Sequence, residues 1–296
     1  MEFEVKRALE WLNEGRSRKE QERHASVLVL KELAEKTPIM FSAYVDEFLN
    51  RIWVTIRDPK KEIREAGALA LKACLELIAN RAKTRHTQMI HQSVYQEVIK
   101  TFNNNTAEGI HGALLALREL LDGTGQFMLA RFKEVCDLVL KHKDHKTPLV
   151  REAVVSTLPQ IAKFAPEAFV RKYLTPSLKH VMKTVQAQGG EAFIALGTLA
   201  VAVKQSIEPQ LAAIVALVQD GLSEKNKKRD SHFALECVSL LARAVGQRLV
   251  PYTKNLVRVI IPFAGCIHKS FFFIFLFSYS FLFKILKILR CRWTRC

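Results

Sequence analysis

Residues 64–66 read Arg64-Glu65-Ala66, and the same three residues return as Arg151-Glu152-Ala153. The general pattern is a basic or small residue, any residue and then alanine, and each copy opens a helical apolar stretch. It occurs six times, with its alanines 39 to 47 residues apart, at Ala25, Ala66, Ala113, Ala153, Ala192 and Ala234. A period of about 40 residues is typical of stacked helix pairs, so the sequence predicts an α-solenoid.

The residue eight positions after each alanine lies near the same face of the predicted helix. It is apolar in all six copies: Leu33, Cys74, Leu121, Ile161, Ala200 and Ala242. Because a small residue at the motif alanine lets a neighbouring helix approach closely, we expect these inner helices to pack between repeats. The solenoid should therefore be elongated, since each repeat contacts only its neighbours.

Outer helices are expected to precede or follow the inner ones. Their predicted ranges are Phe3–Leu12, Phe41–Arg57, Gln92–Phe102, Phe127–His142, Glu167–Val185, Gln210–Leu222 and Tyr252–Phe263. The prolines agree with this division: Asp58-Pro59 and Thr147-Pro148 precede inner helices, whereas Pro38, Pro166, Pro209 and Pro251 introduce outer helices. No strand pair is predicted in residues 1–265, so the expected class is all-α, with about six and a half helix pairs.

Composition is that of a folded chain, with 49% hydrophobic and 25% charged residues. The six cysteines form no C-x-x-C pair and the first residues are charged, so we expect the reducing cytosol or nucleus rather than secretion. Asn104-Asn105-Thr106 matches a glycosylation pattern but is interpreted as a polar loop between helices.

The formal net charge is +16, and residues 266–296 contribute six cations and no acid to it. The densest remaining cluster, Lys225, Lys227, Lys228 and Arg229, precedes an inner helix and is a candidate contact for phosphates. No aromatic residues alternate with these cations to stack on bases. A solvated loop is the favoured interpretation, and nucleic acid is not the expected partner.

The end of the chain departs from the repeat pattern. Ser270 to Phe283 are fourteen uncharged residues that hold seven of the eighteen phenylalanines. A membrane-spanning helix needs roughly twenty apolar residues, and Lys269 and Lys284 bracket this run too closely. We therefore predict two parts: a solenoid at 1–265, and a hydrophobic basic tail at 266–296 that is foreign to the repeat and produced by splicing or an incorrect gene model. A membrane anchor is the less favoured alternative.

The sequence contains no recognisable catalytic, cofactor-binding or metal-binding motif. The chain has no glycine-rich phosphate loop and none of the catalytic motifs of a protein kinase, and Gly123-Thr124-Gly125 is interpreted as a helix-ending turn. The pairs His142 with His145 and His86 with His91 are expected to be exposed, since no cysteine or carboxylate completes a metal set. Cys74 and Cys237 are expected to be buried. We predict no catalytic residue, no cofactor and no metal.

Five segments resemble a known family. They are Glu2–Leu12, Arg23–Leu33, Asp58–Glu65 continuing through Leu71–Leu75, Ile110–Leu115 and Leu240–Gly246. In their order and their amino-acid sequence they look like the N-terminal HEAT-repeat region of the serine/threonine protein kinase TOR, the target of rapamycin, over residues 2 to about 265. The solenoid would then be of the HEAT type, and the chain a truncated fragment or a splice or gene-model product without the family's earliest repeats.

The resemblance implies a protein-docking scaffold for a kinase of nutrient and growth signalling, with no catalysis in this chain because the kinase domain is absent. The implied partners are a Raptor-type companion subunit and other components of the TOR complex. The implied location is the cytoplasm, organelle surfaces or the nucleus. The segment between Leu121 and Arg131 is much shorter than the loop of animal TOR proteins. A generic HEAT adaptor for transport or phosphatase assembly is the second hypothesis, and a nucleic-acid binder the third.

Overall fold

The computed structural model describes residues 2–13, 19–80, 85–223 and 231–260. Within these ranges the chain is helical, without a strand, which confirms the predicted all-α class. The chain divides into two compact units, Met1–Thr157 and Leu158–Cys296. The predicted solenoid boundary at residue 265 and the tail 266–296 lie outside the described residues, and the division proposed there remains a prediction.

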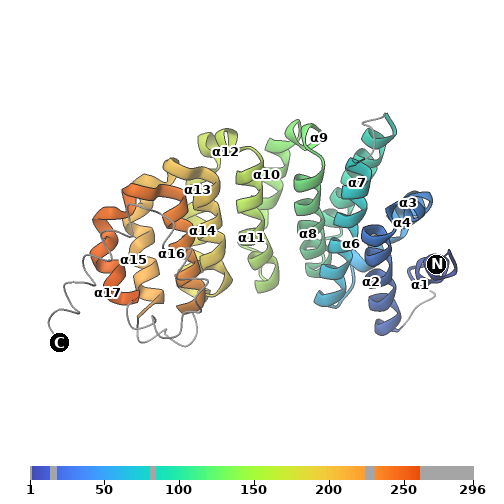
Figure 1. The fold of residues 1–296 in the computed structure, drawn as a ribbon, viewed down its shortest axis with the longest axis horizontal. Coiled ribbons are helices and arrows are strands. Elements are labelled where there is room, and N and C mark those ends of the chain that lie inside the picture. Colours follow the sequence, from blue (N-terminus) through green and yellow to red (C-terminus); the bar gives the residue numbers. More distant parts are fainter. Residues whose placement is uncertain (1, 14–18, 81–84, 224–230, 261–296) are drawn as a thin grey trace. The chain divides into compact units, whose positions relative to one another are not determined.

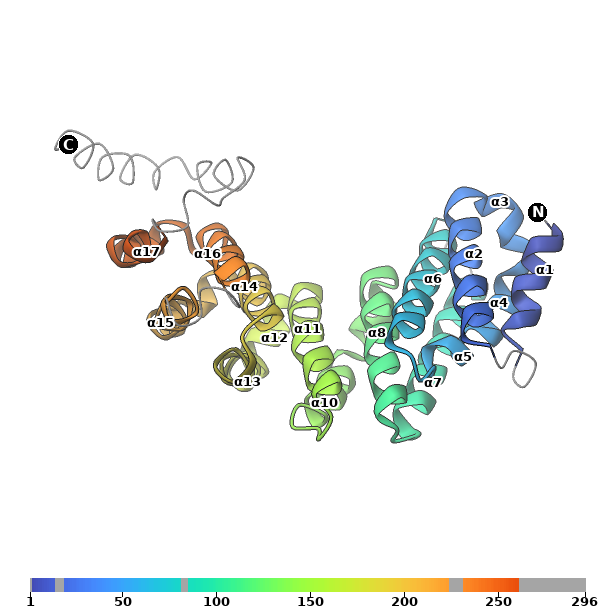
Figure 2. The same cartoon turned by 90° about the horizontal axis from the view of Figure 1, so that it is seen from below.

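Two layers of helices build unit 1. The inner helices are α2 (Glu20–Lys36), α6 (Lys61–Ala79) and α8 (Ala107–Gly123), and Figure 2 shows them side by side. The second layer holds the outer helices α1 (Glu2–Trp11), α3 (Pro38–Phe41), η1 (Ser42–Tyr44), α4 (Val45–Arg51), α5 (Trp53–Ile56), α7 (Arg85–Asn103), α9 (Gln126–Leu129) and α10 (Phe132–Lys141). Helix α11 (Pro148–Phe164) crosses the boundary between the units.

Unit 2 repeats the plan (Figure 1). Its inner helices α14 (Glu191–Val203) and α16 (Ser231–Val245) pack against each other. Helix α15 contacts both α13 and α17 in the outer layer. The outer elements are α12 (Pro166–Lys172), α13 (Leu174–Gln188), η2 (Lys204–Gln210), α15 (Leu211–Gly221), η3 (Gly246–Tyr252) and α17 (Thr253–Ile260).

Five of the six motif alanines are buried, as the packing hypothesis requires: Ala66, Ala113, Ala153, Ala192 and Ala234. The prediction is wrong for Ala25, which is exposed on α2. Among the inner helices described, α2 contacts only α6. One of its two sides therefore has no inner helix against it. The residues eight positions after the motif alanines show a similar dependence of burial on neighbouring helices. Leu33 and Ala242, on the first and last inner helices among the described residues, are half-buried, and the other four are buried.

This difference gives a direct stability test. Replacing Ala66, which is 6% exposed, with leucine should lower the free energy of unfolding by about 1 to 3 kcal/mol, because the added methylenes overpack the contact between inner helices. The same change at Ala25 should cost little, since the side chain points to solvent. Chemical denaturation of both variants measures the two effects, and equal values would contradict the assigned repeat face.

The outer helices are more divided than the sequence predicted. The ranges expected to be continuous at Phe41–Arg57, Phe127–His142 and Glu167–Val185 each break into shorter helices. The breaks at Tyr44, Arg131 and Tyr173 share φ between −104° and −109° with ψ near zero. This region of backbone space is sparsely allowed and ends regular helix. A short helical segment precedes each break and leads the chain into the outer layer. Helix α7 differs from its prediction in another way: it was predicted from Gln92 and begins earlier, at Arg85.

Several local predictions are confirmed. Pro38, Pro148 and Pro166 begin helices, and α8 ends at Gly123 followed by Gly125 with φ of 49°. The segment Asn104-Asn105-Thr106 connects α7 to α8, and Thr106 caps α8 by accepting a hydrogen bond from the Gly109 amide at 3.1 Å.

The stretch Glu191–Gly221 is long and apolar enough, by composition, to cross a membrane. In the structure it is divided among α14, η2 and α15, with Lys204 in a left-handed conformation at φ of 50°. Eight of the thirteen α14 residues are buried, and α14 packs against α13 and α16. The apolar residues of α14 are therefore explained by its packing as an inner helix.

Candidate docking surfaces

The predicted basic patch of Lys225, Lys227, Lys228 and Arg229 lies outside the described residues. Helix α15 ends at Gly221 and α16 begins at Ser231, so the patch lies between these two helices in the sequence. Its role remains a prediction.

The histidine pairs do not assemble a metal site within the described ranges. The His142 and His145 rings are 6.3 Å apart, and His142 stacks on Phe102 with ring centroids at 5.6 Å. His86 is exposed as expected, but His142 and His145 are only half-exposed, and the prediction for His91 is wrong because that side chain is 7% exposed. Burial lowers the pKa of His91 below its ordinary value. Its position on the packed face of α7 explains the difference.

The cysteine predictions are confirmed, since Cys74 and Cys237 are fully buried in inner helices. Burial raises the pKa of the Cys237 thiol far above its ordinary value. A thiol held in its neutral form is a poor nucleophile. These two cysteines are part of the packing.

A partly buried arginine connects one repeat to the next. Arg23 of α2 donates from Nε to Asp58 Oδ2 at 2.6 Å, and the Asp58 side chain is 1% exposed. Asp58 Oδ1 also accepts from the Lys60 amide at 2.9 Å. The sequence predicted Asp58 only as a turn residue. Its ion pair joins positions 35 residues apart, and no local pattern signals such a contact.

Two of the motif arginines, Arg64 and Arg151, donate hydrogen bonds to backbone carbonyl oxygens. Arg64 donates from Nη1 to the carbonyl oxygens of Asp58 and Pro59, and Arg151 donates to the carbonyl oxygens of His145 and Lys146. Each arginine thus fastens the loop that precedes its own inner helix. Arg64 also donates from Nε to His111 Nδ1 at 3.0 Å, which links α6 to the motif position of α8. These charged side chains have structural partners and are not free for chemistry.

The His111 contact predicts a pH effect. Burial, helped by Arg64, Lys61 and Arg118, lowers the pKa of His111 to about 4. Between pH 6.5 and 4 the unfolded chain therefore binds a proton that the folded chain does not. Stability should fall as pH falls through this window, by up to about 1.4 kcal/mol per pH unit.

Replacing His111 with asparagine keeps an acceptor for Arg64 but removes the titration. Between pH 6.5 and 5 the variant should lose about 2 kcal/mol less stability than the original chain. Urea denaturation at the two pH values measures this difference, and the exposed His86→Asn change is the control. Parallel loss in the original chain and the His111 variant would contradict the assignment.

A cleft of about 790 Å³ lies beside the turn from α8 to α9, bordered by α7. On one wall the Arg131 guanidinium lies 3.8 Å from the Phe127 ring centroid and donates to Gln92 Oε1 at 2.6 Å. Arg131 thereby connects two successive repeats. This wall is built from the short segment after Leu121.

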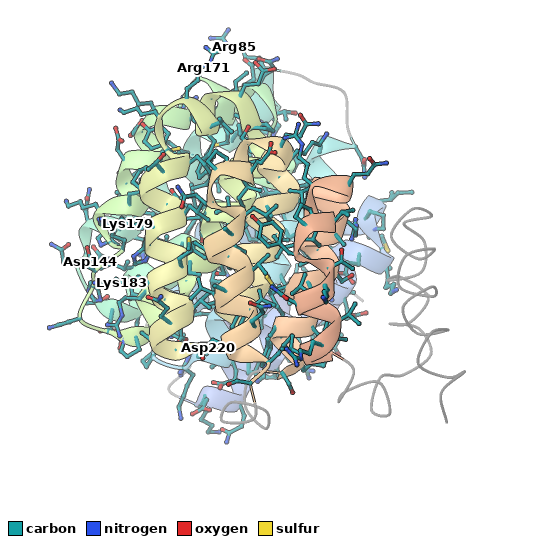
Figure 3. The ribbon with its side chains drawn as sticks, turned by 90° about the vertical axis from the view of Figure 1, so that its left-hand side faces the viewer. Arg85, Asp144, Arg171, Lys179, Lys183 and Asp220 are labelled. Carbon is teal, nitrogen blue, oxygen red and sulfur yellow. The ribbon has the colours of Figure 1, made fainter. Side chains whose placement is uncertain are left out.

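Helix α13 in unit 2 and the exposed face of α6 and α8 in unit 1 carry different charges. Helix α13 of unit 2 carries no acid, and Figure 3 shows its exposed Lys179 and Lys183 pointing outward. In unit 1 the exposed face of α6 and α8 carries Glu76, Glu119 and Asp122. Burial is the main cause that raises the pKa of the Glu119 carboxyl, and the Asp122 and Glu76 carboxylates add to it against Arg118 and Lys72. These side chains therefore share one surface.

Comparison with known proteins agrees with this architecture. No family model matches the chain. The serine/threonine-protein kinase TOR of Oryza sativa subsp. japonica is 37% identical over 257 residues, which are 86% of this chain and 10% of that protein. TOR of Arabidopsis thaliana is 36% identical over 261 residues, covering 88% and 10%. Tor1 of Schizosaccharomyces pombe is 31% identical over 272 residues, covering 90% and 12%. Over 86% to 90% of its residues, the chain is therefore similar in sequence to a segment of TOR kinases.

The chain spans about a tenth of the length of these TOR relatives. Among solved structures, Kap121p matches 88% of this chain with a TM-score of 0.68 at 14% identity, over 27% of its own length. A designed armadillo repeat protein in complex with the peptide (KR)4 matches 80% of this chain with a TM-score of 0.50 at 14% identity. At these identities the likeness shows the fold alone, a helical-repeat solenoid within a TOR relative.

Proposed function

We propose that this chain is a protein-docking scaffold of a TOR-type kinase assembly in nutrient and growth signalling, and that it performs no catalysis itself. The sequence relation to TOR kinases over 86% to 90% of the chain is the observation that carries this proposal. The fold supports it, because stacked helix pairs present an extended surface for partners.

The described charged side chains also support a scaffold. Arg23 with Asp58 and Arg64 with His111 hold neighbouring repeats together rather than lining a cleft. Within the described residues, no three His, Cys, Asp or Glu side chains gather as a metal site would need. A surface for another protein requires none of these.

We propose a Raptor-type companion subunit as the main partner, with the cytoplasm, an organelle surface or the nucleus as the location. The solved relatives in fold include Kap121p bound to Ste12p and Kap121p bound to Nup53p, so solenoids of this type do bind other proteins. The choice of a Raptor-type subunit rests on the TOR relation alone.

Reconstitution tests the proposal. The tagged full chain should co-elute with a co-expressed Raptor-type subunit of the same organism in gel filtration, at a constant ratio across the peak. An unrelated helical-repeat protein of similar size should not co-elute, and serves as the control. Separate elution of chain and subunit would contradict the proposed partner.

A further inference from the structure

The inner helices of unit 1 leave a row of leucines uncovered. Leu28 of α2 is 44% exposed and Leu69 of α6 is 48% exposed, and each lies three residues after its motif alanine. Leu115 of α8, two residues after Ala113, is half-buried. Helix α6 contacts both α2 and α8, and Figure 2 shows the three helices side by side. Each leucine lies on the side of its helix that is not fully buried, so we infer that the three form one line across neighbouring helices. We name Leu28, Leu69 and Leu115 the leucine row.

Carboxylates border the leucine row on both sides. Toward the helix N-termini lie Glu62, Glu65 and Glu108, and toward the C-termini lie Glu32, Glu35, Glu76, Glu119 and Asp122. Four cations share the face with these eight acids. Lys31 bonds Glu35 at 3.0 Å and Glu32 at 3.4 Å, and Lys61 bonds Glu65 at 3.5 Å. Lys72 and Arg118 act on Glu119, so the face keeps more carboxylates than cations. A chain of net charge +16 thus presents an acidic face with an apolar centre.

We propose that the leucine row docks an amphipathic helix whose apolar stripe is bordered by lysine or arginine on both sides. This inference rests on the proposed docking function and specifies the chemistry of one partner surface. Exposed leucines at the centre favour apolar contact, while the carboxylates on either side attract cations and set the orientation.

The spacing of the row fits a helix lying across α2, α6 and α8. Packed helices are about 8 to 10 Å apart, and seven residues of helix rise about 10.5 Å. A partner with an apolar residue every seven positions therefore meets one leucine of the row per heptad. Such a helix also carries two separate flanks, which match carboxylates on both sides of the row.

The same charges disfavour other partners for this face. The phosphates of nucleic acids and the head groups of anionic lipids would meet carboxylates along both borders and be repelled. Glu119 is attracted by Arg118 and Lys72 and repelled by Asp122 and Glu76, and a cationic partner would add to the attraction.

A synthetic peptide probes the face directly. We would titrate the full chain into a labelled helical peptide of about three heptads, with leucines on one stripe and lysines on both flanks, and follow fluorescence anisotropy. Leu69→Gln and Glu76→Lys should each weaken binding about tenfold, the loss expected for a central anchor or a reversed border charge. Both sites are exposed, so the helical circular dichroism should not change.

Matched controls come from the same unit. Leu129 of α9 is 46% exposed and Asp46 of α4 is exposed, and both lie on outer helices. Leu129→Gln and Asp46→Lys should leave the affinity within about twofold of the original chain, as for surface changes outside a contact. A peptide with glutamate in place of every lysine should not bind.

Failure to bind the lysine peptide, or equal affinity of all four variants, would overturn the assignment of the leucine row. Co-elution with the Raptor-type subunit tests the docking function separately. If that subunit co-elutes and the peptide does not bind, the scaffold stands and the assigned partner chemistry for this face is wrong.

Discussion

The Gly112→Ala variant should lose about 3 kcal/mol of unfolding free energy, the upper end of the range for overpacking a core. Gly112 is buried on α8, where the helix passes the end of α5. A Cβ added there would overlap the Ile56 carbonyl oxygen and lie 2.8 Å from the Ile56 carbonyl carbon. Because these are backbone atoms, no rotamer change relieves the overlap and the two helices must separate.

Gly123→Ala is the matched control on the same helix. A Cβ at Gly123 would meet Leu75 Cβ at 3.4 Å, an ordinary contact distance. Its effect should stay within about 1 kcal/mol, the difference in helix propensity between glycine and alanine. Guanidinium denaturation followed by circular dichroism measures both variants, and similar losses would show that α8 does not approach α5 as closely as described.

Arg23→Met should destabilise the chain by about 3 kcal/mol, the lower end for breaking a buried ion pair. The change removes the partner of a carboxylate that is 1% exposed and leaves Asp58 with the Lys60 amide alone. The hydrogen bond to Asp58 also raises the pKa of Arg23, so the guanidinium keeps its charge at neutral pH. Denaturation at neutral pH measures the loss.

A double-mutant cycle separates the pair from the rest of the core. Adding Asp58→Asn to Arg23→Met should recover part of the lost stability, because the uncompensated charge disappears. Lys6→Met breaks an ion pair with Glu2 in which both side chains are about 60% exposed, and it should have no measurable effect. A negligible cost for Arg23→Met would mean that the contact does not hold the two repeats together.

The repeat period predicted the inner helices well because it reports a physical requirement. Ala66, Ala113, Ala153, Ala192 and Ala234 are all buried where small side chains allow close packing. Ala25 carries the same motif but is exposed, because burial depends on which helix lies next to it. A pattern of residue types identifies a face, and only the arrangement of helices determines whether that face is covered.

Two features had no adequate signal in the sequence. The breaks at Tyr44, Arg131 and Tyr173 share a backbone conformation but no residue type, so the outer helices were predicted as continuous. The middle motif position was read as any residue, yet at Gly112 the approach of Ile56 leaves room for glycine alone. Both depend on contacts between segments distant in the sequence.

The candidate surfaces also differ in how visible they are in the sequence. A cluster of cations at 225–229 is conspicuous in the sequence, whereas the leucine row is spread over three helices. Leu28 and Leu69 resemble core residues until the structure shows each of them about half exposed. The acidic border is equally hidden, since its carboxylates come from helices that also contain lysine and arginine.

The central claim is that this segment serves docking rather than chemistry. The direct measurement deletes the matching segment from rice TOR and compares two readouts, the amount of co-purified Raptor-type subunit and the phosphorylation rate of a short generic peptide. We predict that the companion subunit is lost while peptide phosphorylation persists. Retention of the companion at its full ratio, or loss of peptide phosphorylation by a soluble and folded deletion variant, would contradict the claim.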